Sequence, residues 1–224
     1  MSQKHDLFEN RRQFQLERMI LFSDAVFAIA ITLLVIEIRI PNLTHLDSRA
    51  AAWSELRNDL LEKFPEFFGF ILSFWVIGQF WHTHHNLFGY VEDYNGKLIW
   101  LNLHMLFWII LVPFSSALNS HYGGLNQVWC WYSLNMFMIA VSLFWLWQYI
   151  GNPANKLSAI ALHPQLKKMS QRRSLAVAVI FLSGGLLSFL NGSFFFVLSR
   201  GIYFLIFPAM ALISRHFRKK MIPS

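Results

Sequence analysis

Long apolar stretches alternate with short polar segments along the chain. The first lies between Arg18 and Pro41, and from Met19 to Ile36 it carries one charge, Asp24. A helix rises about 1.5 Å per residue, so this stretch reaches about 34 Å, enough to cross a hydrocarbon layer of about 30 Å. The pattern predicts a membrane-spanning helix.

Five more apolar stretches follow, and together they predict an all-α membrane protein with six spans. We expect the later spans at about 65–90, 98–119, 125–149, 174–191 and 193–214. Pro113 is expected to kink the third span, and Asn191 with Gly192 to form the turn before the last. Residues 42–64 mix charged and apolar side chains at helical spacing. They predict either an amphipathic helix on the outer surface or an exposed connecting helix.

Helical spacing separates the side chains of the first span into two faces. At about 100° per residue, one set lies within about 60° of a single direction: Phe22, Ala25, Ile29, Thr32, Leu33, Ile36 and Ile40. Ser23 and Asp24 point well over 100° away from that direction. One face is therefore an aliphatic ladder broken by a single hydroxyl, and the Ser-Asp pair is expected to face the protein interior.

Asp24 is expected to have a specific role, because a charge inside a membrane span is costly. The cost is on the order of 2.5–3.5 kcal/mol or more, and such residues usually face a bundle interior or a water path. The alternative is that Asp24 lies near the membrane surface, about one turn into the helix, and pairs with Arg18.

Composition and charge fit a polytopic membrane protein of one domain. The 224 residues are 55% hydrophobic and 14% charged, whereas an ordinary soluble domain has about 25% charged residues. With both termini inside, 14 lysines and arginines lie on the inner side and four on the outer side. This bias explains the net charge of +7 without nucleic acid, and it predicts cytoplasmic tails at 1–17 and 215–224 around a membrane domain at 18–214.

Three histidines near the inner end of the second span, His82, His84 and His85, suggest two kinds of site. A metal centre is disfavoured, because there is no second histidine box and no H-E-x-x-H motif. The single Cys130 excludes a cysteine cage. We therefore predict no metal and no cofactor.

The alternative is a polar network, because a buried aspartate needs hydrogen-bond donors. We expect four side chains at similar depth to meet Ser23 and Asp24: His82, His85, Asn102 and His104. Any one of these histidines could instead anchor the helix at the membrane interface beside Trp81. The sequence contains no nucleophile motif and no phosphate-binding loop. The protein is therefore not expected to be an enzyme.

Three motifs resemble those of one known family. The string R-x-x-x-F-S-D at Arg18, Phe22, Ser23 and Asp24, followed by AVFAIAITLLVIEIRIP, is similar to the first-helix signature of the transmembrane protein 175 family. The motif W-x-x-H-H-N in the second span also resembles that family's pattern. So does a string in the third span that begins with N-L and ends with P-F. Its members are potassium-permeable channels, and the likeness is to the bacterial single-repeat form.

The resemblance implies a homotetramer in the bacterial inner membrane, with four first helices lining a potassium pore and lipids around it. The matching positions are Ile29 for an aliphatic ring, Thr32 for a hydroxyl ring assigned to cation preference, and Leu33 and Ile36 above them. Aliphatic rings would gate by excluding water, and Glu37 would enrich cations at the outer mouth. The filter string T-V-G-Y-G of ordinary potassium channels is absent from the sequence.

Two other functions stay open at this point. A proton-linked secondary transporter could use Asp24 and the histidines as a relay, and a membrane enzyme could use the histidine cluster. Transporters usually break helices at the midplane. The first span has no internal glycine or proline, which disfavours the transporter.

Overall fold

The structure is a computed structural model that describes residues 2–36, 38, 40, 43, 48–158, 163–190 and 192–221. The described residues form helices, turns and one isolated bridge between Val91 and Ser158. The predicted all-α class is confirmed.

Helix α1, Ser2–Ile36, is longer than the predicted first span. From residue 2 onward the polar segment 1–17 is helical and continuous with the first span, and its place in the cytoplasm stays a prediction. Helix α2, Arg49–Glu62, is capped by Ser48, whose Oγ accepts a hydrogen bond from the Ala51 backbone N–H at 3.1 Å. This satisfies one of the N–H groups that a helix start leaves unpaired.

The second and third predicted spans are α3, Phe64–Phe88, and a broken pair, α4, Gly96–Ile110, and α5, Val112–Tyr122. The break lies at Leu111, two residues before Pro113. Proline has no backbone N–H and is well tolerated only in the first turn of a helix. The predicted kink is thus a short interruption, after which a new helix begins.

The C-terminal half contains the remaining helices: α6, Asn126–Ile150, η1, Pro153–Asn155, α7, Pro164–Leu187, α8, Ser193–Gly201, η3, Ile202–Leu205, and α9, Ile206–Met221. Gly192 has a φ of 118° at the turn before α8, a conformation that favours glycine. Asn191, predicted in the same turn, lies outside the described residues.

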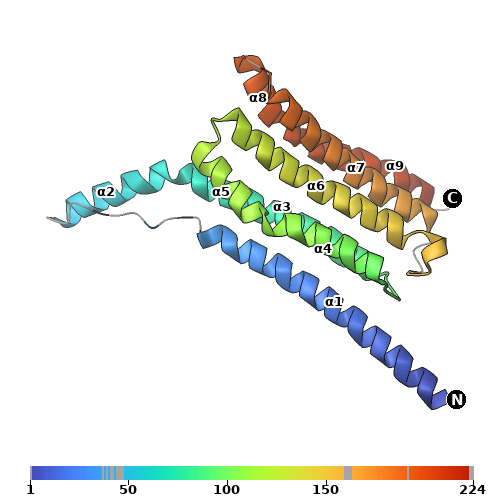
Figure 1. Ribbon diagram of the computed structural model, residues 1–224. Helices are drawn as coiled ribbons and strands as arrows, with labels where there is room; N and C mark the ends of the chain where they lie inside the picture. The colour runs from blue at the N-terminus through green and yellow to red at the C-terminus, as the bar shows by residue number, and fades with distance from the viewer. Residues whose placement is uncertain are drawn as a thin grey trace.

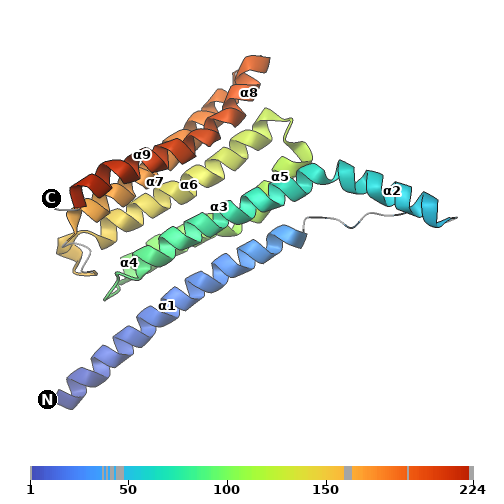
Figure 2. The same ribbon diagram turned by 180° about the vertical axis from the view of Figure 1, so that it is seen from behind.

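The helices pack in an order that leaves α1 at one edge of the bundle. Helix α1 contacts α3, α4 and α5, α6 joins these to α7, and α7 contacts α9. Both chain ends lie at one end of the bundle, and α2 projects from the opposite end (Figures 1 and 2). One side of α1 is therefore not covered by its own chain.

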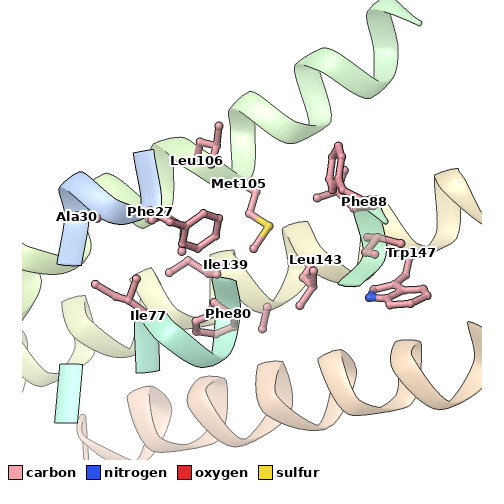
Figure 3. Close-up of a cluster of buried hydrophobic side chains, with 14 of the residues drawn as sticks. Phe27, Ala30, Ile77, Phe80, Phe88, Met105, Leu106, Ile139, Leu143 and Trp147 are labelled. Carbon is pink, nitrogen blue, oxygen red and sulfur yellow. The ribbon is translucent and has the colours of Figure 1, made fainter. Parts of the chain in front are cut away.

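The apolar core lies between α1, α3, α4 and α6 (Figure 3). Phe27 and Ala30 of α1 meet Ile77 of α3, Met105 of α4 and Ile139 of α6, all buried. Burying a large apolar side chain contributes about 1.5–3 kcal/mol relative to exposure. This core stabilises the packing of the Phe27 and Ala30 side of α1 against the other helices.

Four described helical segments are long and apolar enough to cross a membrane: Arg11–Ile36, Gly96–Tyr122, Asn126–Ile150 and Ser193–Phe217. They correspond to the first, third, fourth and sixth predicted spans. Helices α3 and α7 have 25 and 24 residues, but they are not among these four. A total of six spans stays a prediction.

At Gly184 the Tyr203 ring of η3 packs directly against the backbone of α7. A Cβ at this position would overlap the ring of Tyr203. That ring cannot move freely, because its hydroxyl hydrogen-bonds Ser133 and its face stacks on Trp129 with ring centroids 5.4 Å apart. The absence of a side chain at Gly184 therefore sets the spacing of these helices.

We predict that Gly184→Ala destabilises the protein by about 1–3 kcal/mol, the usual cost of overpacking a filled core. The matched control is Gly78→Ala on α3, where a Cβ meets nothing within 4 Å. Alanine there should be neutral or stabilising by up to about 1 kcal/mol. Thermal unfolding of the purified protein compares the two, and equal melting temperatures would contradict the packing argument.

Candidate functional site

Helix α1 buries one narrow stripe of side chains against α3 and α4. Its buried members recur at intervals of seven, four, three and four residues: Leu16, Ser23, Phe27, Ala30 and Leu34. This is the spacing of one helical face. Ser23 is the polar member of the stripe and is fully buried.

The aliphatic ladder lies on an exposed side of α1. Ile29, Leu33 and Ile36 are 56%, 40% and 69% exposed, and Phe22 is 53% exposed. Ala25 and Thr32 are exposed on the same face. The apolar ladder therefore lies on the edge helix of the bundle, and no other described helix of the same chain covers it.

Thr32 is the hydroxyl within this ladder. Its Oγ1 donates a hydrogen bond to the Ile29 carbonyl oxygen at 2.9 Å. The hydroxyl proton is thus held by the helix, and the oxygen keeps lone pairs that can accept from a donor or ligate a cation. The site can offer an oxygen ligand at an otherwise aliphatic surface.

A buried hydrogen-bond chain attaches α1 to α3 and α4 through Asn102. Its Nδ2 donates to Ser23 Oγ at 2.8 Å, and Ser23 Oγ donates to the Met19 carbonyl oxygen at 2.9 Å. Asn102 Oδ1 lies 2.8 Å from His84 Nε2. An amide oxygen only accepts, so Nε2 carries the proton in this arrangement.

His84 is held by aromatic rings as well as by Asn102. Its ring stacks on Phe88 with centroids 4.2 Å apart and lies 5.3 Å from the Phe27 ring. Its Nδ1 is buried with no hydrogen-bond partner among the described residues. The three side chains Ser23, Asn102 and His84, which we call the α1 anchor, thus join three helices within the apolar core.

Asp24 lies beside this anchor and is only partly buried. Its Oδ1 accepts a hydrogen bond from Trp81 Nε1 at 2.9 Å, and its Oδ2 lies 3.8 Å from His85 Nδ1. The side chain keeps 30% exposure. Arg18 lies over the Phe14 ring, 5.9 Å from its centroid, and no ion pair with Asp24 occurs between these described side chains.

The predicted polar side chains divide between several places. Asn102 contacts Ser23 and His85 lies near Asp24, as described above. His82 instead faces Asn86, with Nε2 and Nδ2 3.1 Å apart. His104 lies in a separate cluster, where its Nδ1 is 2.9 Å from Ser142 Oγ of α6 and Trp108 donates to its Nε2. Glu37, predicted at the outer mouth, lies outside the described residues.

The sequence prediction missed His84 and Trp81 as partners in this region. A signal for His84 was present, because it follows Phe80 by four residues and precedes Phe88 by four on the buried stripe of α3. The described residues contain no group of three or more histidines, cysteines or carboxylates that could hold a metal. The arrangement suits structural attachment of α1 more than it suits chemistry.

Comparisons with known proteins identify the family. The family model described as endosomal/lysosomal potassium channel TMEM175 matches residues 18–113. A potassium channel of Chryseobacterium sp. (strain P1-3) is 31% identical over 194 residues, covering 84% of this chain and 88% of its own. The chain belongs to the TMEM175 family. A potassium channel of Streptomyces collinus is 34% identical over 133 residues, covering 58% of this chain and 61% of its own.

A solved structure supports the family's fold along most of the chain. The crystal structure of a lysosomal potassium-selective channel TMEM175 homolog from Chamaesiphon minutus matches with a TM-score of 0.70 and 27% identity. The match covers 88% of this chain and 97% of that one. Both the exposed ladder and the α1 anchor lie within residues 18–113, the part that the TMEM175 family model matches.

We predict that Asn102→Ala destabilises the protein by about 1–3 kcal/mol, because it leaves the buried His84 Nε2–H without an acceptor and removes the donor to Ser23 Oγ. Asn86→Ala is the matched control, since Asn86 is exposed and its side-chain amide faces only the exposed His82 one turn away among the described residues. Its effect should stay within about 0.5 kcal/mol. Thermal unfolding in detergent distinguishes them, and a stable Asn102→Ala variant would show that the anchor is dispensable.

Proposed function

We propose that the chain forms a potassium-preferring cation channel, as a homotetramer of six-span subunits in which four α1 helices surround the pore. The exposed ladder of α1 carries this proposal, because it is an unpartnered face on the edge helix of each chain. The names of the relatives as potassium channels support the permeant ion. Residues of one helix form closed rings only when several copies meet around an axis.

In such a tetramer, Ile29, Leu33 and Ile36 form stacked aliphatic rings. A narrow neck of aliphatic side chains excludes water and therefore blocks ions. Opening requires the four α1 helices to tilt or rotate until the neck widens and fills with water. The apolar rings thus act as the gate.

Thr32 is proposed to set the cation preference. Its hydroxyl oxygen is free to ligate, since its proton is donated to the Ile29 carbonyl. Four such oxygens can replace part of an ion's hydration shell. This favours potassium, which loses water more easily than sodium.

The α1 anchor and Asp24 are proposed to hold the pore helix rather than contact ions. Ser23 points into the core, and Asp24 meets Trp81 and His85 of α3. We propose that the protein lies in a bacterial inner membrane with both termini in the cytoplasm, and their common position at one end of the bundle supports this. Glu37 is proposed to enrich cations at the opposite mouth.

Recording from the purified protein in a planar bilayer tests the proposal directly. Potassium is placed on one side and sodium on the other. We expect discrete current steps whose reversal potential shows a preference for potassium. Silent bilayers combined with slow, saturable uptake into liposomes would contradict a channel and favour a carrier.

We predict that Thr32→Ala lowers the potassium-to-sodium permeability ratio severalfold, because the hydroxyl ring is lost. Thr32→Ser is the matched control and should keep the preference, since it retains the oxygen. Reversal potentials under the same two-cation gradient measure both. An unchanged ratio in Thr32→Ala would remove Thr32 from the selectivity role.

We predict that Asp24→Ala lowers the yield of assembled tetramer before it changes selectivity, because the variant loses the acceptor for Trp81. Asp24→Asn keeps an acceptor oxygen and should assemble better than alanine. Size-exclusion chromatography with light scattering measures assembly. Normal tetramer yield together with altered selectivity would contradict the structural role.

A further inference from the structure

Acidic side chains are confined to one part of the sequence. All 12 aspartates and glutamates lie within the first 93 residues, and the 11 lysines and arginines after Asp93 have no acidic neighbour in their own half. The positive-inside rule explains where lysines and arginines lie, but acidic residues contribute little to that rule. It therefore does not account for a half-chain without any acid.

Helices α7 and α9 bring part of this positive charge together. They pack side by side, and their basic ends lie at the end of the bundle that holds both termini (Figures 1 and 2). Arg173 Nη2 of α7 donates to Ser214 Oγ of α9 at 2.8 Å. The Arg172 guanidinium lies 5.3 Å from the ring centroid of Phe217, which is buried. Both contacts join α7 arginines to the turn of α9 that contains Arg215.

These cations are not neutralised by the described part of the protein. The ion pairs among the described side chains involve other residues: Arg12, Lys63, His85 and His121. Lys168, Arg172 and Arg215 are exposed, and the buried Nε of Arg173 has no hydrogen-bond partner among the described residues. Lys168 and Arg172 are also four residues apart on one helix, where like charges repel. An anion at this position would relieve the repulsion.

The depth of the cluster indicates which anion it meets. The apolar run of α7 starts at Leu175, two residues after Arg173, and that of α9 ends at Ile213, directly before Ser214 and Arg215. With α7 and α9 as the fifth and sixth spans of the proposed channel, on which this inference rests, the cluster lies where both helices leave the hydrocarbon layer, at the level of lipid headgroups. A guanidinium group can bind a phosphate through two parallel N–H···O hydrogen bonds. Basic sites between membrane helices bind anionic lipid headgroups.

We propose that the basic ends of α7 and α9 form a binding site for the phosphate headgroup of an anionic phospholipid. Arg172, Arg173 and Arg215 hold the phosphate, and Lys168 adds charge at its outer side. A zwitterionic lipid has the same phosphate, but its ammonium group is repelled by the cluster. The site thus prefers phosphatidylglycerol to phosphatidylcholine.

Native mass spectrometry of the purified full-length protein tests this site, with phosphatidylglycerol and phosphatidylcholine of equal chain length. We expect several-fold more retained phosphatidylglycerol, and Lys168→Gln/Arg215→Gln should abolish this preference. Both substituted side chains are exposed, so folding should be kept, as an unchanged melting temperature would show. Arg172→Gln alone should weaken the preference in the same direction.

The matched control is Arg11→Gln/Lys156→Gln, which removes the same charge from two exposed positions outside the cluster. It should keep the preference for phosphatidylglycerol. Equal retention of both lipids by the wild-type protein would overturn the proposal. So would an equal loss in the cluster and control variants, because that result reports net charge rather than a site.

Discussion

The hydrogen bond from Asn102 to Ser23 is the contact on which the position of α1 depends. It connects the edge helix to α4, while the same amide joins His84 of α3. In an apolar surrounding, an unmade hydrogen bond of a buried group is costly, so the bonded arrangement is strongly preferred. Apolar contacts alone would allow α1 to rotate by part of a turn, whereas this polar chain admits one orientation.

That orientation decides what the rest of α1 presents. With Ser23, Phe27 and Ala30 turned inward, Ile29 and Ile36 necessarily face away from the bundle. The proposed gate and the anchor are thus two consequences of one helical phase. A gate that opens by rotation of α1 would have to strain or break the Asn102 contact, whereas a tilt about the anchor could preserve it.

The sequence was sufficient for features that depend on one helix. The period of α1 separated Ile29, Thr32 and Ile36 from Ser23 without knowledge of any neighbour, and these side chains are exposed while Ser23 is buried. Features that depend on pairing between helices were harder to predict. His104 was expected near Asp24, but it contacts Ser142 of α6 instead. The sequence of α4 alone does not indicate that α6 packs on that side.

Neighbouring histidines show the same limit. His82, His84 and His85 are close in sequence, yet only His84 faces the core, and one helical step of about 100° separates its direction from that of His85. To predict which histidine faces the core, the rotation of α3 about its own axis relative to α1 had to be known. The break at Leu111 likewise follows from Pro113, but whether a proline bends or interrupts a helix depends on the surrounding packing.

The most direct test of the account is thiol accessibility on α1 in a Cys130→Ser background. Ile36→Cys and Val35→Cys place thiols on adjacent residues that are 69% and 53% exposed in the single chain, but only Ile36 belongs to the proposed pore face. We predict that a hydrophilic thiol reagent blocks potassium current through Ile36→Cys channels and leaves Val35→Cys channels conducting. Block at Val35→Cys with none at Ile36→Cys would contradict the proposed orientation of the pore helix.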